Sequence, residues 1–327
     1  KSGCFSENGE YLKLGRVRLR LSPNPFIQYT KFEQCLKLKD GSILISANKD
    51  NGESVCIKVW VDIFTQSIHF DMHSNKKIAL EAFYENWRTE DKELTDKNRG
   101  RFGCFGLEGY PGKVIKKKDQ IVFSENGILF YHRNTGNTLS PDVMIEQQKL
   151  SRYKDEICNT ISNLTFGGFI FGDNLVAGSI TEGKYCNTDF KSWSLKSKKA
   201  SNDYHFQIAT YKEQTADVNQ WISCLKEKAA VANNEKGNPE RNTEWWREFW
   251  NQSWIITDPT RRDSACLWEV GRNYQLFRYQ LGCNLYGEYP SKFNGGNLTF
   301  DPAYVDSRLE HGPDWRQWGG DVFTAQN

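Results

Sequence analysis

Alternation of apolar and polar residues over the first two thirds of the chain predicts β-structure. Residues 16–21, RVRLRL, place charged and aliphatic side chains on opposite faces, as a half-buried antiparallel strand does. Residues 36–45, LKLKDGSILI, predict a hairpin whose Asp40-Gly41 turn uses the positive φ that glycine tolerates. Further strands are predicted over residues 55–61, 67–72, 78–86, 120–123, 128–132, 164–171 and 204–211.

Helical spacing interrupts this alternating pattern once. Charged and amide residues recur at that spacing from Pro141 to Ile161, which predicts one surface helix lying across the sheets. The charged run at residues 116–119, KKKD, is predicted to be a solvated hairpin end rather than a phosphate-binding patch. Many strands and one helix over residues 1–212 predict a large antiparallel β-sandwich.

The pattern becomes helical after residue 212. Thr215 is a candidate N-cap, and an apolar helical stripe follows it at Val218, Trp221, Ile222, Leu225 and Ala229. Gly237 to Pro239 indicate a linker. Beyond it, helical spacing resumes at Thr243, and seven of the eleven tryptophans lie in this part. We therefore predict a β-domain over residues 1–212, a helical linker over 213–241 and the start of an aromatic-rich helical domain over 242–327.

Composition narrows the class of protein. A length of 327 residues allows two domains, and a net charge of +2 gives no indication of a nucleic-acid or membrane surface. No run approaches the roughly 18 apolar residues of a membrane span, and no signal peptide is visible at Lys1. The nine cysteines are scattered without a CxxC pair, which argues against a zinc ribbon and leaves the cellular compartment open.

The last 56 residues carry the candidate chemistry. Tryptophan, tyrosine, amide and carboxylate side chains interleave there with glycines, a mixture typical of sugar pockets, where rings pack on pyranose CH groups. The candidate substrate-binding residues are Asn294, His311, Trp315, Trp318 and Asp321, and the family resemblance given below adds Asn327. Each has a structural alternative: a glycine-rich turn at Asn294, a solvated loop at His311, core packing for the tryptophans and a helix cap at Asp321.

Other residues are not predicted to form a site. The remaining carboxylates in this part of the chain are expected to be solvated surface charges, since their spacing singles out no pair: Glu269, Glu288, Asp301, Asp306, Glu310 and Asp314. His69 and His73 are four residues apart, but in a strand this spacing does not create the metal-binding face that it creates on a helix. We predict no metal site and no cofactor.

Several motifs resemble inverting glycoside hydrolases, above all the alpha-L-fucosidases of family 95. Residues 11–19, YLKLGRVRL, resemble the "xxPLGDLRL" strand of that family's sandwich, and residues 4–9 take the place of its tryptophan-containing loop. Residues 274–281 are similar to a helix of its barrel. Residues 289–295, YPSKFNG, resemble its "lpxnLqGxW" loop, and residues 318–327 resemble the first part of "PPWxSDYTxNINxQMNYW".

This resemblance implies a fold and an incomplete site. The family has an N-terminal β-super-sandwich, a helical linker and an (α/α)6 barrel, so the chain is expected to be a fragment holding only the first barrel helices. The catalytic acid and base would lie beyond Asn327. Asp321 matches the aspartate of "SDY". Asn327 matches the second water-orienting asparagine of "NIN" or else bridges barrel helices, whereas Ala325 replaces the first asparagine, a departure from strict 1,2-alpha-L-fucosidases.

The function that follows is hydrolysis of a terminal sugar, alpha-L-fucose or a galacto-configured relative, from an oligosaccharide or polysaccharide with inversion. The resemblance also implies a secreted, periplasmic or cell-surface location. Two alternatives remain open. One is a non-catalytic glycan-binding protein, and the other is a polysaccharide lyase on a similar helical scaffold, which would need a tyrosine or histidine base.

Overall fold

The structure is a computed structural model that describes residues 4–97, 100–185, 187–234, 238–257, 265–287 and 313–314. Its strands are β1 (Arg16–Ser22), β2 (Lys31–Lys37), β3 (Ser42–Asn48), β4 (Ser54–Asp62), β5 (Ser67–Asn86), β6 (Lys92–Leu94), β7 (Val114–Lys116), β8 (Gln120–Ser124), β9 (Gly127–Arg133), β10 (Leu164–Gly172), β11 (Leu175–Tyr185), β12 (Thr188–Ser197) and β13 (Ser201–Gln214). Its helices are α1 (Leu139–Gln147), the 3-10 helix η2 (Ser151–Glu156), α2 (Val218–Asn234), α3 (Pro239–Asn251) and α4 (Ala265–Gly282).

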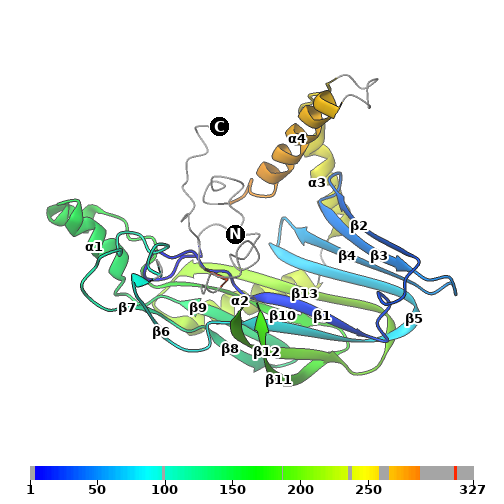
Figure 1. Cartoon of the computed structure of the whole chain (residues 1–327), viewed down its shortest axis with the longest axis horizontal. Helices are drawn as coiled ribbons and strands as arrows, with labels where there is room; N and C mark the ends of the chain where they lie inside the picture. Colours follow the sequence, from blue (N-terminus) through cyan, green and yellow to red (C-terminus); the bar gives the residue numbers. More distant parts are fainter. Residues whose placement is uncertain are drawn as a thin grey trace.

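The long strand β5 joins two antiparallel layers. Its first part pairs with β4 and β13 in a layer ordered β2-β3-β4-β5-β13-β10-β9-β8. Its second part, from Ala79 to Asn86, pairs with β1 on one side and β12 on the other, and β11 continues that layer beyond β12. Figure 1 shows these strands as the body of the molecule, with α1 at one end and α3 and α4 at the other. The predicted antiparallel sandwich is thus present.

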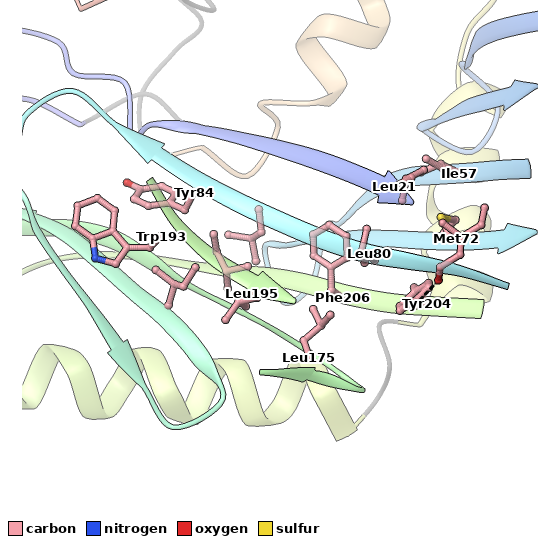
Figure 2. Close-up of a cluster of buried hydrophobic side chains, with 14 of the residues drawn as sticks. Leu21, Ile57, Met72, Leu80, Tyr84, Leu175, Trp193, Leu195, Tyr204 and Phe206 are labelled. Atoms are coloured by element: carbon pink, nitrogen blue, oxygen red, sulfur yellow. Dashed lines mark hydrogen bonds between the residues drawn. The ribbon is translucent and has the colours of Figure 1, made fainter. Parts of the chain in front are cut away.

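The main hydrophobic core lies between the two layers. Strand alternation turns Ile128 and Phe130 of β9 and Phe206 and Ile208 of β13 toward it, where they meet Leu195 of the other layer. Figure 2 shows this cluster extending from Trp193 and Tyr84 at one end to Met72 and Tyr204 at the other. Because one continuous core spans both layers, burial of its apolar side chains holds the layers together.

Helix α2 covers the opposite face of the β13–β10–β9 layer. Trp221, Leu225 and Ala229 are buried against Leu129 and Phe169 in a second apolar cluster. The predicted helical stripe is therefore the face that packs on the sheet. The predicted N-cap Thr215 is wrong by two residues, because α2 begins at Val218 and the carboxylate of Asp217 accepts a hydrogen bond from the backbone N–H of Asn219.

Helix α3 docks on the β2–β3 turn. Asn238 caps it by accepting a hydrogen bond from the backbone N–H of Arg241, with Pro239 at the first turn. The indole Nε1 of Trp250 donates to the carbonyl of Leu38 at 2.7 Å. Gly41 has φ +65°, and a Cβ there would meet the ring of Trp246, so this turn requires glycine for two reasons.

Three other sequence predictions differ from the structure. The single helix expected from Pro141 to Ile161 is two short pieces, α1 and η2, separated where Lys149 takes φ +57°. Residues 67–72 and 78–86, expected as separate strands, form the one strand β5. Strands β6, β7, β11 and β12 were not predicted.

After α3, the described residues form one further helix, α4, and the predicted barrel stays a prediction. Several apolar side chains of α4, among them Val270 and Phe277, are exposed. Among the described helices, none combines the length and the apolar character that crossing a membrane would require.

Removal of a side chain from the α2–sheet contact should destabilise the protein strongly. We expect Leu225→Ala to lower the free energy of unfolding by about 2–5 kcal/mol, because Leu225 is fully buried and alanine leaves a cavity. Val231→Ala, on the same helix but half exposed, is the control and should change it by less than about 0.5 kcal/mol. Urea unfolding measures both values. Equal losses would show that α2 is not held by this face.

Candidate functional site

A group of charged side chains is largely buried where residues 4–15, the end of β5, the β7–β8 connection and β9 meet. We call this group the buried charge network. Its members are Glu7, Glu10, Arg88, Lys116, Asp119, His132 and Asp314. Charged side chains are seldom buried unless they are paired, so each member requires a partner.

Arg88 lies at the centre of the network, with its side chain only 2% exposed. Its Nε and Nη2 donate to the two carboxylate oxygens of Asp119 at 3.1 and 2.6 Å, a bidentate pair. Its Nη1 donates to Oδ2 of Asp314 at 2.7 Å. The amide of Asn86 adds a bridge, since its Oδ1 accepts from the Arg88 backbone N–H and its Nδ2 donates to Asp119.

Asp314 brings a distant part of the chain to the sandwich. Besides Arg88, its carboxylate accepts hydrogen bonds from the backbone N–H of Lys13 at 2.9 Å and from the indole Nε1 of Trp87 at 3.0 Å. Burial opposes ionisation of this carboxyl, but the charges of Arg88 and Lys116 outweigh burial and lower its pKa to about 2. The carboxyl of Asp314 is therefore ionised near neutral pH.

Two further pairs complete the network. Nδ1 of His132 lies 2.8 Å from Oδ1 of Asp119, and its Nε2 lies 3.5 Å from Oε2 of Glu7. Burial lowers the pKa of His132, but the hydrogen bond with Asp119 and the nearby Glu7 carboxylate outweigh burial and raise the pKa overall. Nζ of Lys116 lies 2.5 Å from Oε1 of Glu10, whose own pKa is raised by burial.

This arrangement is suited to holding segments together. Each of its carboxylates faces at least one cationic group, and Arg88 reaches three segments through Asp119, Asp314 and the carbonyl of Lys13. Glu7 and Glu10 each keep one buried oxygen without a hydrogen-bond partner among the described residues. No group of three or more His, Cys, Asp or Glu in the described part of the chain is placed to hold a metal ion.

All six predicted substrate-binding residues lie outside the described residues: Asn294, His311, Trp315, Trp318, Asp321 and Asn327. The same holds for Glu288, Asp301, Asp306 and Glu310, whereas Glu269 is described and exposed, as expected.

Two predictions about solvated charges are wrong. Asp314, expected at the surface, is 3% exposed and accepts three hydrogen bonds. In the run at residues 116–119, expected to be a solvated hairpin end, Lys116 and Asp119 are part of the buried charge network. The sequence does contain a signal for the position of Lys116, because strand alternation puts its side chain on the same side as the buried Val114.

Comparison with known proteins gives one family match. The model of the family described as "Domain of unknown function (DUF5703)", in its N-terminal part, matches residues 1–255. No curated protein matches the chain.

Two solved structures are similar over most of the chain. One is described as a kojibiose phosphorylase from human microbiome, with 12% identity and a TM-score of 0.45 over 84% of this chain and 32% of that one. The other is a bacterial glucoamylase complexed with acarbose, with 8% identity and a TM-score of 0.32 over 81% of this chain and 34% of that one. The chain thus spans about a third of the length of each. Similarity this low decides neither fold nor function.

Breaking the central ion pairs should cost much stability. We expect Arg88→Met to lower the free energy of unfolding by about 3–5 kcal/mol, because it leaves Asp119 and Asp314 buried without their main cation. Arg20→Met removes the exposed pair with Glu81 and should cost no more than about 1 kcal/mol. Chemical denaturation of both variants tests this. Similar small losses would mean that Arg88 does not hold the network.

Acid should weaken the network through Asp314. A carboxyl whose pKa falls from 3.8 to about 2 on folding contributes stability that is complete above pH 4 and is lost as the pH falls toward 2. By linkage this contribution is about 2 kcal/mol. Asp314→Asn should therefore show a smaller fall in urea midpoint between pH 5 and pH 2 than the unmodified chain. Parallel pH profiles for the two proteins would contradict the assignment.

Proposed function

This chain belongs to the DUF5703 family, and we propose that the complete protein is a carbohydrate-active enzyme that hydrolyses the bond to a terminal sugar. The proposal rests on the residues that follow Asp314 in the sequence, because Asp314 itself is bound to the sandwich. Asp314, anchored in the sandwich by Arg88 and Trp87, directly precedes Trp315 in the sequence. Trp318 and Asp321 follow within seven residues of Asp314.

The anchor at Asp314 carries the proposal. A binding loop loses affinity when it must be ordered with each ligand, and a fixed point at its start reduces that cost. An aspartate that is almost fully buried, ion-paired and bonded to a backbone N–H provides such a point. The sandwich would in this way support the segment in which the aromatic and amide residues of the predicted sugar pocket lie.

The individual roles follow from side-chain chemistry. Trp315 and Trp318 would stack on the CH face of a pyranose, while Asp321 would accept a hydrogen bond from a sugar hydroxyl. Asn294 and His311 would also contact the sugar, and Asn327 would orient the attacking water. Inverting hydrolysis places an acid and a base about 6.5–9.5 Å apart with that water between them, and we assign both to residues beyond Asn327.

The proposed substrate is a terminal alpha-L-fucoside or a galacto-configured relative in an oligosaccharide or polysaccharide. This finer assignment comes from the resemblance of residues 289–295 and 318–327 to family 95 motifs. Ala325, where strict 1,2-alpha-L-fucosidases keep an asparagine, favours a different substrate or another way of holding the water. Such substrates are extracellular glycans, so we also propose a secreted, periplasmic or cell-surface location.

The direct test uses the full natural protein and aryl alpha-L-fucosides, aryl galactosides and glycans with those end groups. Release of free sugar, with inverted anomeric configuration by NMR, is the expected result. Binding of the glycans without turnover would instead indicate a glycan-binding protein. Unsaturated uronate products would indicate a lyase. Absence of both binding and turnover across the panel would contradict a carbohydrate function.

A tryptophan substitution tests the proposed pocket separately. We expect Trp318→Ala in the full protein to weaken glycan binding or raise KM about fivefold, because a stacking contact is worth roughly 1 kcal/mol. The control is Trp254→Ala, a described tryptophan that is 60% exposed and lies outside the proposed pocket segment. Isothermal titration gives both affinities. Equal affinities for the two variants would exclude Trp318 from the pocket.

A further inference from the structure

A second group of polar side chains lies on the helix-covered face of the sheet, near the start of β5. Strand alternation places His69 and Asp71 of β5 on the same face as His205 and Gln207 of β13. In the register of the two strands, His69 is opposite Gln207 and Asp71 is opposite His205. The two imidazole rings are therefore diagonal neighbours, and their centres are 5.5 Å apart.

One nitrogen of each imidazole is engaged by a hydrogen bond. Nδ1 of His205 lies 2.5 Å from Oδ1 of Asp71, whose other oxygen accepts from the indole Nε1 of Trp60 at 2.8 Å. Nε2 of His69 lies 2.6 Å from the hydroxyl of Ser67, and the His69 ring stacks on Trp60 at 4.3 Å. Both rings are thus fixed in orientation.

The remaining polar atoms of this group are buried and unsatisfied. Nδ1 of His69, Nε2 of His205 and Oε1 of Gln207 have no hydrogen-bond partner among the described residues. His69 and Gln207 are fully buried, and the amide Nε2 of Gln207 donates to Asn233. Burying one such atom unpaired is costly, so three of them on neighbouring positions require a partner from outside the described residues.

We propose that His69 Nδ1, His205 Nε2 and Gln207 Oε1 bind a divalent transition ion of the zinc type, with water as a fourth ligand. A tetrahedral ion lies about 2.0–2.1 Å from each imidazole nitrogen, and the ring centre lies about 1.1 Å farther, which places two such ring centres about 5 Å apart. The observed separation of the two ring centres, 5.5 Å, is close to this value. The site is independent of the proposed hydrolase function.

The surroundings of the three atoms favour a cation. The Asp71 carboxylate behind His205 is the outer partner that metal-binding histidines commonly have, since it fixes the tautomer and makes the ring more basic. The side chains of Asp71 and His205 are partly exposed, which gives an ion a route of entry.

The experiment titrates the metal-free 327-residue chain with Zn²⁺ by calorimetry and with Co²⁺ by visible absorption. We expect one zinc ion per chain with a Kd below about 10 μM, and tetrahedral Co²⁺ bands without thiolate charge-transfer absorption. The absence of thiolate charge-transfer absorption is required because the eight described cysteines are free thiols, which could bind the metal elsewhere. A chain that binds no zinc, or that binds it only through thiolate, would overturn the proposal.

Three variants assign the site to its residues. His205→Gln should abolish the tetrahedral Co²⁺ bands, and Asp71→Asn should weaken zinc binding about 10- to 100-fold through loss of the outer partner. His73→Gln is the matched control, because His73 also pairs with an aspartate, Asp203, but is exposed. It should bind zinc like the unmodified chain. If His205→Gln does not fold, Asp71→Asn decides, and unchanged affinity in that variant would overturn the site.

Discussion

The positive charge of Arg88 is the constraint on which the arrangement of distant chain segments depends. Water does not reach its guanidinium, so the protein must supply the compensating anions. Asp119 supplies one from the β7–β8 connection and Asp314 supplies the other from a segment 226 residues away in the sequence. These segments have to meet where the guanidinium nitrogens point, which fixes the N-terminal loop, the end of β5 and residue 314 relative to one another.

Much of the fold could be predicted from the sequence because burial in a two-layer sandwich imposes alternation. The strands with one clearly apolar face, such as β9 and β10, were predicted within one residue at each end. β11 was not predicted, because most of its side chains are exposed and its apolar positions do not alternate. The break between α1 and η2 was also not predicted, since positive φ at Lys149 has no local sequence signal.

The candidate site was less predictable, for a related reason. His132 could have been found, since it continues the inward series of Ile128 and Phe130 and a histidine there needs a buried partner. Asp314 could not, because nothing in the local sequence distinguishes its carboxylate from the other acidic side chains of residues 272–327. Its burial depends on Arg88 and Trp87, and only the tertiary structure brings these residues together. An ion pair between residues as far apart in the sequence as Arg88 and Asp314 leaves no periodic pattern in the sequence.

Strand β5 also limits which changes in length the protein can tolerate. It is hydrogen-bonded to β4 and β13 along its first part and to β1 and β12 along its second. Inserting one residue near Ser74 would keep one part in register and turn every side chain of the other part to the opposite face. Leu80 and Ala82 would then point away from the core while Glu81 and Glu85 pointed into it. Length variation in relatives should therefore be confined to the loops on either side of this strand.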